Sequence, residues 1–155
     1  DFSRKTWIYF LESKSEAFSF FKSFKLMVEN EARVKIGTLR SDRGGEFTSK
    51  EFNDFCASHG IKRHVTAAFT PQQNGVAERK NRTIMNMVRC LLMETGMPKR
   101  FWGEAASWTT HILNRCPTSA LKEKTPQECW TGTKPNIGHL KVFGCVGYAH
   151  VPSQK

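Results

Sequence analysis

Hydrophobic and polar positions follow two different periods along the chain, which predicts strands and helices in turn. A short aromatic and β-branched run at residues 6–11 is typical of a strand. Residues 14–30 repeat apolar side chains at helical spacing and predict an amphipathic helix that packs on a sheet. Residues 33–39 predict the next strand, with Val34 and Ile36 on one of its faces.

The second quarter of the chain continues this alternation. Thr48 and Glu51 have the spacing of a helix-capping box, which predicts that a short helix begins there. Gly60 has the backbone freedom to end that helix. Residues 61–67 then predict another strand, and the polar turn 70–75 leads out of it.

Two further helices and an irregular tail are predicted for the rest of the chain. Residues 76–93 fit a long helix, and Pro98 is expected in the first turn of the next one. Beyond Cys116 the chain becomes rich in loops, and the apolar residues 139–151 predict a short β segment. Inward-facing side chains are expected at Ala77, Ile84, Val88 and Leu91 of the first helix, and at Phe101, Trp102, Ala105, Ile112 and Leu113 of the second.

Charge and cysteine content narrow the possible classes of protein. A net charge of +10 at pH 7 favours a nucleic-acid partner through phosphate neutralisation, although a basic protein without such a partner is an equal alternative on charge alone. No apolar run approaches the ~20 residues that cross a bilayer, so no membrane partner is expected. Five cysteines without a C-x-x-C pair favour reduced thiols in an intracellular protein.

Two acidic residues occupy positions that suggest chemistry. Asp42 ends a predicted strand and faces a glycine turn, and Glu78 opens a helix after a glycine-bearing loop, with thirty-five residues between them. If strands 33–39 and 61–67 are neighbours in the sheet, their carboxyl ends converge and the two carboxylates can meet at one edge. Such hard oxygen ligands suit Mg²⁺, and two ions about 3.5–4 Å apart promote phosphoryl transfer.

Each carboxylate also has an ordinary structural interpretation. An aspartate before Arg-Gly-Gly is often only a turn residue, and a glutamate in a first helical turn often only interacts with the helix dipole. The helix favours the functional interpretation, because Glu78, Arg82 and Arg89 share one face with Asn81 at its border. This face is a candidate surface for a metal ion and phosphate, and the loop 70–75 is a candidate flap over DNA.

Four segments closely resemble the integrase catalytic core of copia-class long-terminal-repeat retrotransposons, especially those of plants. They are LRSDRGGEF, FTPQQNGVAERKNRTI, FWGEAASWTTHILNRCP and HLKVFGC, and the resemblance runs along essentially the whole chain. It implies a ribonuclease-H-like fold with three acidic residues that hold Mg²⁺ or Mn²⁺, of which Asp42 is the second and Glu78 the third. The expected nucleic-acid-binding residues are Gln72, Gln73 and Asn74 at a DNA end, Arg79, Lys80 and Arg82 on phosphates, and Asn81 and Arg89 beside them.

One departure from the family is expected to matter. The family's first acidic residue lies on its first strand, in a segment that normally precedes this chain, and Asp1 is not that acid. The resemblance therefore implies an N-terminally truncated α/β core, with a ribonuclease-H-like mixed sheet flanked by helices that lacks its first strand and most of its second. Residues 1–116 would be this incomplete integrase catalytic core, and residues 117–155 a loop-rich C-terminal extension with a short β segment.

The resemblance also implies a reaction. The complete enzyme would join the 3′ ends of element DNA to target DNA by metal-dependent phosphoryl transfer, as a homo-oligomer and in the nucleus. Without the first carboxylate, the isolated chain is expected to be inactive. Two alternatives stay open at this point: a metal-dependent nuclease of the same fold that acts on RNA–DNA hybrids or junctions, and a non-catalytic nucleic-acid-binding remnant or domesticated module.

Overall fold

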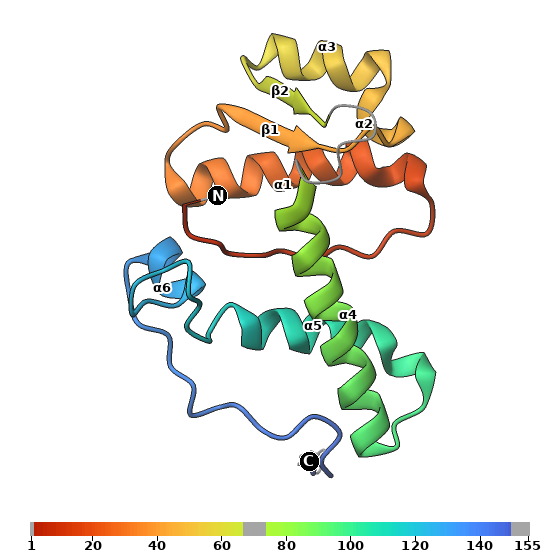
Figure 1. The fold of residues 1–155 in the computed structure, drawn as a ribbon, viewed down its shortest axis with the longest axis vertical. Helices are drawn as coiled ribbons and strands as arrows, with labels where there is room; N and C mark the ends of the chain where they lie inside the picture. Colours follow the sequence, from red (N-terminus) through yellow and green to blue (C-terminus); the bar gives the residue numbers. More distant parts are fainter. Residues whose placement is uncertain (1, 67–73, 150–155) are drawn as a thin grey trace, which may run out of the picture. The chain divides into compact units, whose positions relative to one another are not determined.

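The computed structural model describes residues 2–66 and 74–149, which form a mixed arrangement of helices and a small sheet (Figure 1). Two compact units make up the chain. We call Tyr9–Arg82 the strand unit, and Asp1–Ile8 together with Thr83–Lys155 the helical unit. The predicted division between residues 116 and 117 stays a prediction.

The strand unit begins with the predicted helix, whose start is capped in a way that was not predicted. The short η1 (Lys14–Glu16) runs directly into α1 (Ala17–Ala32). Ser13 caps η1, and the Glu16 carboxylate accepts hydrogen bonds from the backbone N–H groups of Glu12 and Ser13. These bonds satisfy donors that a helix start would otherwise leave without partners.

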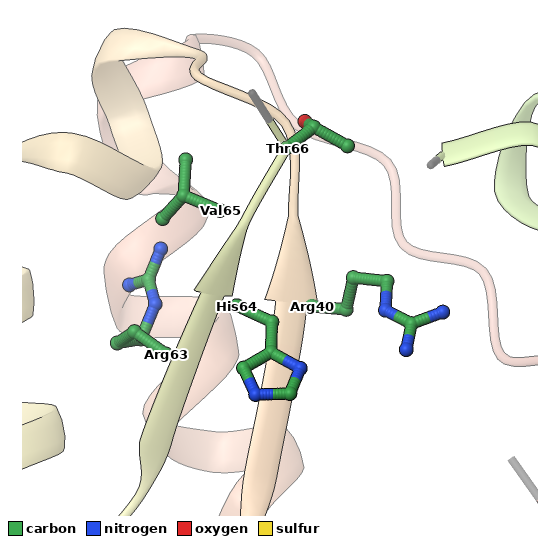
Figure 2. A pocket seen from close by; sticks show the side chains of 5 residues that line it. All are labelled: Arg40, Arg63, His64, Val65 and Thr66. Atoms are coloured by element: carbon green, nitrogen blue, oxygen red, sulfur yellow. The ribbon is translucent and has the colours of Figure 1, made fainter. Parts of the chain in front are cut away.

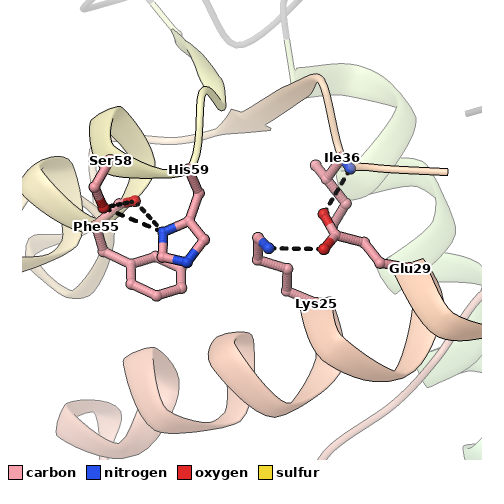
Figure 3. Close-up of polar contacts among 6 residues, drawn as sticks. All are labelled: Lys25, Glu29, Ile36, Phe55, Ser58 and His59. Carbon is pink, nitrogen blue, oxygen red and sulfur yellow. Dashed lines mark hydrogen bonds and ion pairs between the residues drawn. The ribbon is translucent and has the colours of Figure 1, made fainter.

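The next strand starts later than its sequence pattern predicts. Arg33 ends α1 in the left-handed conformation at φ 52°, and Val34 is 68% exposed. The N–H of Ile36 donates to Glu29 Oε1 at 2.8 Å, while Lys25 pairs with the same carboxylate at 2.7 Å (Figure 3). The hydrogen bond from Lys25, followed by that from Ile36, lowers the pKa of Glu29. Residues 33–36 therefore reverse the chain against α1, and the pairing with the second strand begins at Gly37, whose carbonyl oxygen accepts from Lys62 N at 2.9 Å.

The sheet consists of two parallel strands, β1 (Thr38–Ser41) and β2 (Lys62–Val65). Thr38 lies opposite Lys62, and the register continues in step to Ser41 opposite Val65. The expectation that these two regions are neighbours in the sheet is confirmed. Their carboxyl ends consequently lie at the same edge.

Two short helices connect the strands. They are α2 (Gly45–Thr48) and α3 (Lys50–Ser58). The predicted cap of the second helix is off by one residue: Ser49 Oγ accepts from Phe52 N at 3.2 Å, while the Thr48 hydroxyl donates back to Gly44 O inside α2. Gly60 follows α3 at φ 68° and reverses the chain, as predicted.

Aromatic side chains fill the core of the strand unit. Phe52 is fully buried, and its ring centroid lies 5.1 Å from that of Phe21, 5.3 Å from that of Phe18 and 5.7 Å from that of Phe47. Leu39 of β1 packs against the same cluster. The face of the sheet that carries Leu39 therefore packs on the core, and the face that carries Thr38 and Arg40 is the opposite one.

Mostly aliphatic side chains fill the core of the helical unit. Ala105 and Ala106 are fully buried with Val88 and Ile84, and Leu92, Leu113, Ile8 and Phe143 pack against them. Of the inward positions predicted on the long helix, Ala77 is exposed, and Trp102 of the next helix is also exposed. The helices concerned are α4 (Gly75–Thr95), which begins in the strand unit, followed by η3 (Lys99–Phe101), α5 (Trp102–Leu113) and α6 (Pro126–Thr131).

Residues 6–11 do not form the predicted strand. A strand needs a neighbour for its backbone N–H and C=O groups, and here a side chain takes that place. Thr6 N donates to Asn114 Oδ1 at 2.9 Å, and Asn114 Nδ2 donates to Thr6 O at 2.7 Å. The aromatic and β-branched composition of this stretch serves packing, with Trp7 edge-on to Trp130 at 4.9 Å.

The predicted β segment near the end of the chain is also wrong over the described residues 139–149. Val142 and Val146 are 76% and 80% exposed, and Gly144 takes φ 77°. No strand within the described part of the chain lies beside this segment, so its apolar pattern has no sheet to join. His150 and Val151 lie outside the described residues. The fold class itself, a mixed α/β core with a reduced sheet, is confirmed.

Candidate metal and nucleic-acid site

The carboxyl ends of β1 and β2 are held together by hydrogen bonds beyond the strand pairing. Thr66 N and Thr66 Oγ1 both donate to Ser41 O, at 3.1 and 3.2 Å. Arg43 Nε donates to Thr66 O at 3.0 Å. Asp42 sits between Ser41 and Arg43, so its backbone is fixed at this edge of the sheet.

The Asp42 side chain is exposed and is oriented by the turn that follows it. Its Oδ1 atom accepts from Gly44 N at 3.0 Å, which is the turn interaction that aspartate commonly makes. No other described residue donates to this carboxylate. One oxygen is thus used to fix the side chain, and the other stays available for a ligand.

Glu78 lies in the first turn of α4, where its charge interacts favourably with the helix dipole. Because Gly75–Thr95 is helical, the predicted face that contains Glu78, Arg82 and Arg89 is formed, and all three side chains are exposed. Arg89 donates to Asn86 Oδ1 at 3.1 Å. The surroundings of Glu78 are therefore basic on the solvent side of the helix.

The other predicted nucleic-acid contacts divide into described and undescribed residues. Asn74, directly before α4, and Lys80 are half-buried, while Arg79 and Asn81 are exposed. Gln72 and Gln73 lie outside the described residues. The loop predicted to act as a flap falls largely in the same undescribed stretch.

The donor chemistry of Asp42 and Glu78 fits Mg²⁺, which binds one or two protein carboxylates and keeps several water molecules. Both residues belong to the strand unit. Across residues 2–66 and 74–149, no group of three or more His, Cys, Asp or Glu side chains comes together. A shared ion on Asp42 and Glu78 accordingly stays a prediction.

The structure also reveals a basic pocket that the sequence reasoning missed. It has a volume of about 460 Å³ and is lined by Arg40, Arg63, His64, Val65 and Thr66 (Figure 2). Arg40 of β1 and His64 of β2 lie opposite each other in the strand register. The basic residues of β2 are consecutive and β1 carries only Arg40, so no period along either strand indicates this pocket, which depends on the register between them.

Two general features of the molecule bear on its class. Among the described residues, no helix is both long and apolar enough to cross a membrane. All five cysteines are free thiols, with Cys56 buried in the aromatic core.

Comparison with known proteins shows what this chain is similar to. Residues 1–71 match the family described as Integrase core domain. The chain is 47% identical over 155 residues to the Retrovirus-related Pol polyprotein from transposon TNT 1-94 of Nicotiana tabacum, covering 100% of this chain and 12% of the relative. It is 42% identical over 147 residues to that from transposon RE2 of Arabidopsis thaliana, covering 95% and 10%.

The chain thus spans about a tenth of the length of these curated relatives. Among solved structures, the HTLV-2 integrase catalytic core domain in complex with magnesium, in its trimeric form, matches with a TM-score of 0.55. The two are 24% identical, and the match covers 77% of this chain and 71% of the other, which supports the same fold. Residues 1–71 therefore match an integrase core domain, and the chain as a whole is similar to a segment of the Pol polyproteins of plant copia-type retrotransposons.

Proposed function

We propose that Asp42 and Glu78 are two carboxylate ligands of the metal site in a DNA-joining integrase. The parallel pairing of β1 with β2 is the observation that carries this proposal, because it places Asp42 at the carboxyl edge of the sheet. The chain leaves that edge through β2 and reaches α4, where Glu78 is exposed in the first turn. Similarity to Pol polyproteins along all 155 residues supports the same assignment.

In the reaction, a 3′-hydroxyl of element DNA attacks a phosphodiester of target DNA in line. One phosphorus–oxygen bond forms and one breaks, and no covalent protein intermediate is required. A bound divalent ion would activate the attacking hydroxyl and stabilise the leaving oxygen. The magnesium in the HTLV-2 core structure supports Mg²⁺ as that ion, with Mn²⁺ as a substitute.

The residues of this chain bind and orient the metal ion and the DNA. The hydrogen bond from Gly44 N fixes the Asp42 carboxylate before any ligand arrives, so less ordering is needed on binding. Arg79, Lys80 and Arg82 neutralise phosphate charge along the first turns of α4, and Arg89 extends that surface. The polar side chains that position the DNA end are Gln72, Gln73, Asn74 and Asn81.

The assembly and location of the protein follow from this chemistry. Two DNA ends and a target must meet in one complex, which favours a homo-oligomer, and the trimeric form of the HTLV-2 core supports this. Insertion into chromosomal DNA places the reaction in the nucleus.

A strand-joining assay tests the proposal. In an integrase that contains this chain, Asp42→Asn and Glu78→Gln should each lower the joining of labelled element ends to target DNA by about 100-fold or more, since each removes a metal ligand. Asp54→Asn, on the exposed side of α3, is the matched control and should join DNA normally.

Two outcomes would contradict the assignment. Normal joining by Asp42→Asn or Glu78→Gln would remove that residue from the metal site. DNA binding without any joining by the unaltered integrase would favour a non-catalytic binding module instead.

A further inference from the structure

The two strands present one face to the core and the opposite face to solvent. Side chains alternate along a strand, so Thr38 and Arg40 of β1 share a face, as do Lys62 and His64 of β2. The register places Thr38 opposite Lys62 and Arg40 opposite His64, so these side chains form one continuous patch. We call these four residues the basic sheet face, and all four are exposed.

On the opposite face of the sheet, the basic residue Arg63 is bound by other residues of the strand unit. Arg63 Nη2 donates to Ser41 Oγ at 3.0 Å and to Phe47 O at 2.8 Å. Its guanidinium carbon also lies 4.7 Å from the centre of the Phe52 ring. Arg63 is therefore held in place by the fold and has a structural role.

The basic side chains of this face have no such partners. Among the described residues, the side chains of Arg40, Lys62 and His64 form no hydrogen bond, ion pair or ring contact. Elsewhere in the unit, Lys25 pairs with Glu29 at 2.7 Å. A ligand of opposite charge can bind the basic sheet face without first breaking an internal ion pair.

The shape of this region suits an oxyanion better than an apolar partner. Arg40 and His64 line the cavity of about 460 Å³ together with Arg63, Val65 and Thr66, and Figure 2 shows the side chains of Arg40 and His64 on neighbouring strands. Neighbouring strands lie about 4.8 Å apart, so both side chains can reach one phosphate group. Lys62 stands two residues before His64 on β2, about 6.6 Å from it along the strand, where it can reach a second phosphate.

We propose that the basic sheet face binds the phosphate backbone of a DNA strand that runs toward Asp42. Arg40 and His64 hold one phosphate, and Lys62 holds another. This site rests on the proposed function, because that function supplies DNA as the partner, and it adds a contact surface on the sheet to the one expected on α4. Burying the charged side chains of Arg40 and Lys62 under an apolar segment would be costly, whereas phosphates offset that cost.

Fluorescence anisotropy with a labelled DNA duplex tests the proposal on the 155-residue chain. The double variant Arg40→Gln/Lys62→Gln should bind more weakly than the unaltered chain. The slope of log affinity against log salt concentration should become shallower by about 0.9 for each phosphate that the variant no longer neutralises. The matched control, Lys14→Gln/Lys50→Gln, removes the same charge from exposed positions on η1 and α3 and should keep the original slope.

A charge-preserving variant separates binding from folding. Arg40→Lys/Lys62→Arg should retain most of the affinity, and circular dichroism should show the same helix content for every variant. If the glutamine variant binds DNA with the slope of the matched control, the proposal is overturned. It is also overturned if poly-glutamate, but not DNA, binds in a manner that depends on Arg40 and Lys62, since the partner would then be an acidic protein segment.

These measurements are made in EDTA and without a joining assay. Asp42→Asn should therefore leave the salt slope unchanged, whether or not Asp42 serves as a metal ligand. The proposal that the basic sheet face binds DNA and the proposal that Asp42 binds a metal ion can therefore be refuted independently.

Discussion

The two units of the molecule are built on different kinds of core. In the strand unit, the rings of Phe18, Phe21 and Phe47 surround the fully buried Phe52. In the helical unit, Ala105 and Ala106 of α5 are buried in one cluster with Ile84 and Val88 of α4. Large rings supply much of the buried area that stabilises the strand unit, whose described residues form a sheet of two strands.

The two units also differ in whether their polar groups bind one another. In the helical unit they bind one another: Asn114 bonds Thr6, and the Lys5 ammonium lies 5.0 Å from the Trp7 ring. In the strand unit, Asp42 keeps an oxygen available and Arg40 has no described partner. The comparison indicates that the strand unit presents groups for a ligand, whereas the fold of the helical unit uses its own polar groups internally.

The largest expected effect comes from the aromatic core. Phe52→Ala should lower the free energy of unfolding of the strand unit by about 3–5 kcal/mol, because it leaves a cavity among three rings. All four tryptophans belong to the helical unit, so their fluorescence reports on that unit alone. In a urea titration, circular dichroism should therefore show a transition that precedes the change in tryptophan fluorescence.

The matched control for that variant is Leu26→Ala, which removes an apolar side chain that is 64% exposed on α1. It should change the free energy of unfolding by less than about 0.5 kcal/mol. A loss below about 1 kcal/mol for Phe52→Ala would mean that the rings do not form the main core of the strand unit.

An intermediate effect is expected from the side chain that replaces a strand neighbour. Asn114→Ala removes both hydrogen bonds to Thr6 and leaves a backbone N–H and C=O without partners, which should cost about 1–3 kcal/mol. The transition seen by tryptophan fluorescence should shift to lower urea. Asn53→Ala, on the exposed side of α3, should leave that transition in place. Equal behaviour of the two variants would contradict the role of Asn114.

The smallest effect is a pH dependence confined to the helical unit. Arg115 Nη1 lies 3.1 Å from His111 Nδ1, and His111 Nε2 lies 3.1 Å from His139 Nε2. A guanidinium can only donate, so Nδ1 of His111 accepts and its Nε2 carries the proton that is donated to His139. Burial, followed by the charges of Arg115 and His139, lowers the pKa of His111.

The sign of this effect follows from linkage. A lowered pKa in the folded state means that the unfolded chain takes up the proton first, so stability is fully present above about pH 6.5 and falls below it. The melting temperature followed by tryptophan fluorescence should therefore drop between about pH 7.5 and about pH 5.5. His111→Gln should flatten that drop, and His59→Gln in the strand unit should not. An unchanged drop in His111→Gln would assign the effect to other groups.

Local sequence patterns predict the parts of this fold that depend on local interactions. The long helix α4 follows from periodicity, whereas the pairing of β1 with β2, which puts Asp42 at the sheet edge, was a condition that the sequence left open. The prediction of a strand at residues 6–11 was wrong, because a strand forms only beside a neighbouring strand. In its place Thr6 is bound by a side chain 108 residues away, which no local pattern indicates.

The candidate site was predictable to a similar extent. Residue types and spacing identified Asp42 and Glu78, and the helical face that bears Arg82 followed from the 3.6-residue period. The cavity at Arg40 and His64 was not predicted, because it depends on the register between strands that are distant in the sequence. Only the register of the folded sheet reveals that the side chains of Arg40 and His64 lie on the same face.

Paramagnetic broadening by Mn²⁺ tests most directly whether Asp42 and Glu78 share one ion. In the ¹⁵N-labelled chain, the amide signals of Gly44 and Glu78 should broaden together as Mn²⁺ is added in stages. Asp42→Asn should restore both signals, whereas the matched control Asp54→Asn should restore neither. If only one of the two signals broadens, or if Glu78 still broadens in Asp42→Asn, the two carboxylates do not bind a common ion and the proposed metal site is wrong.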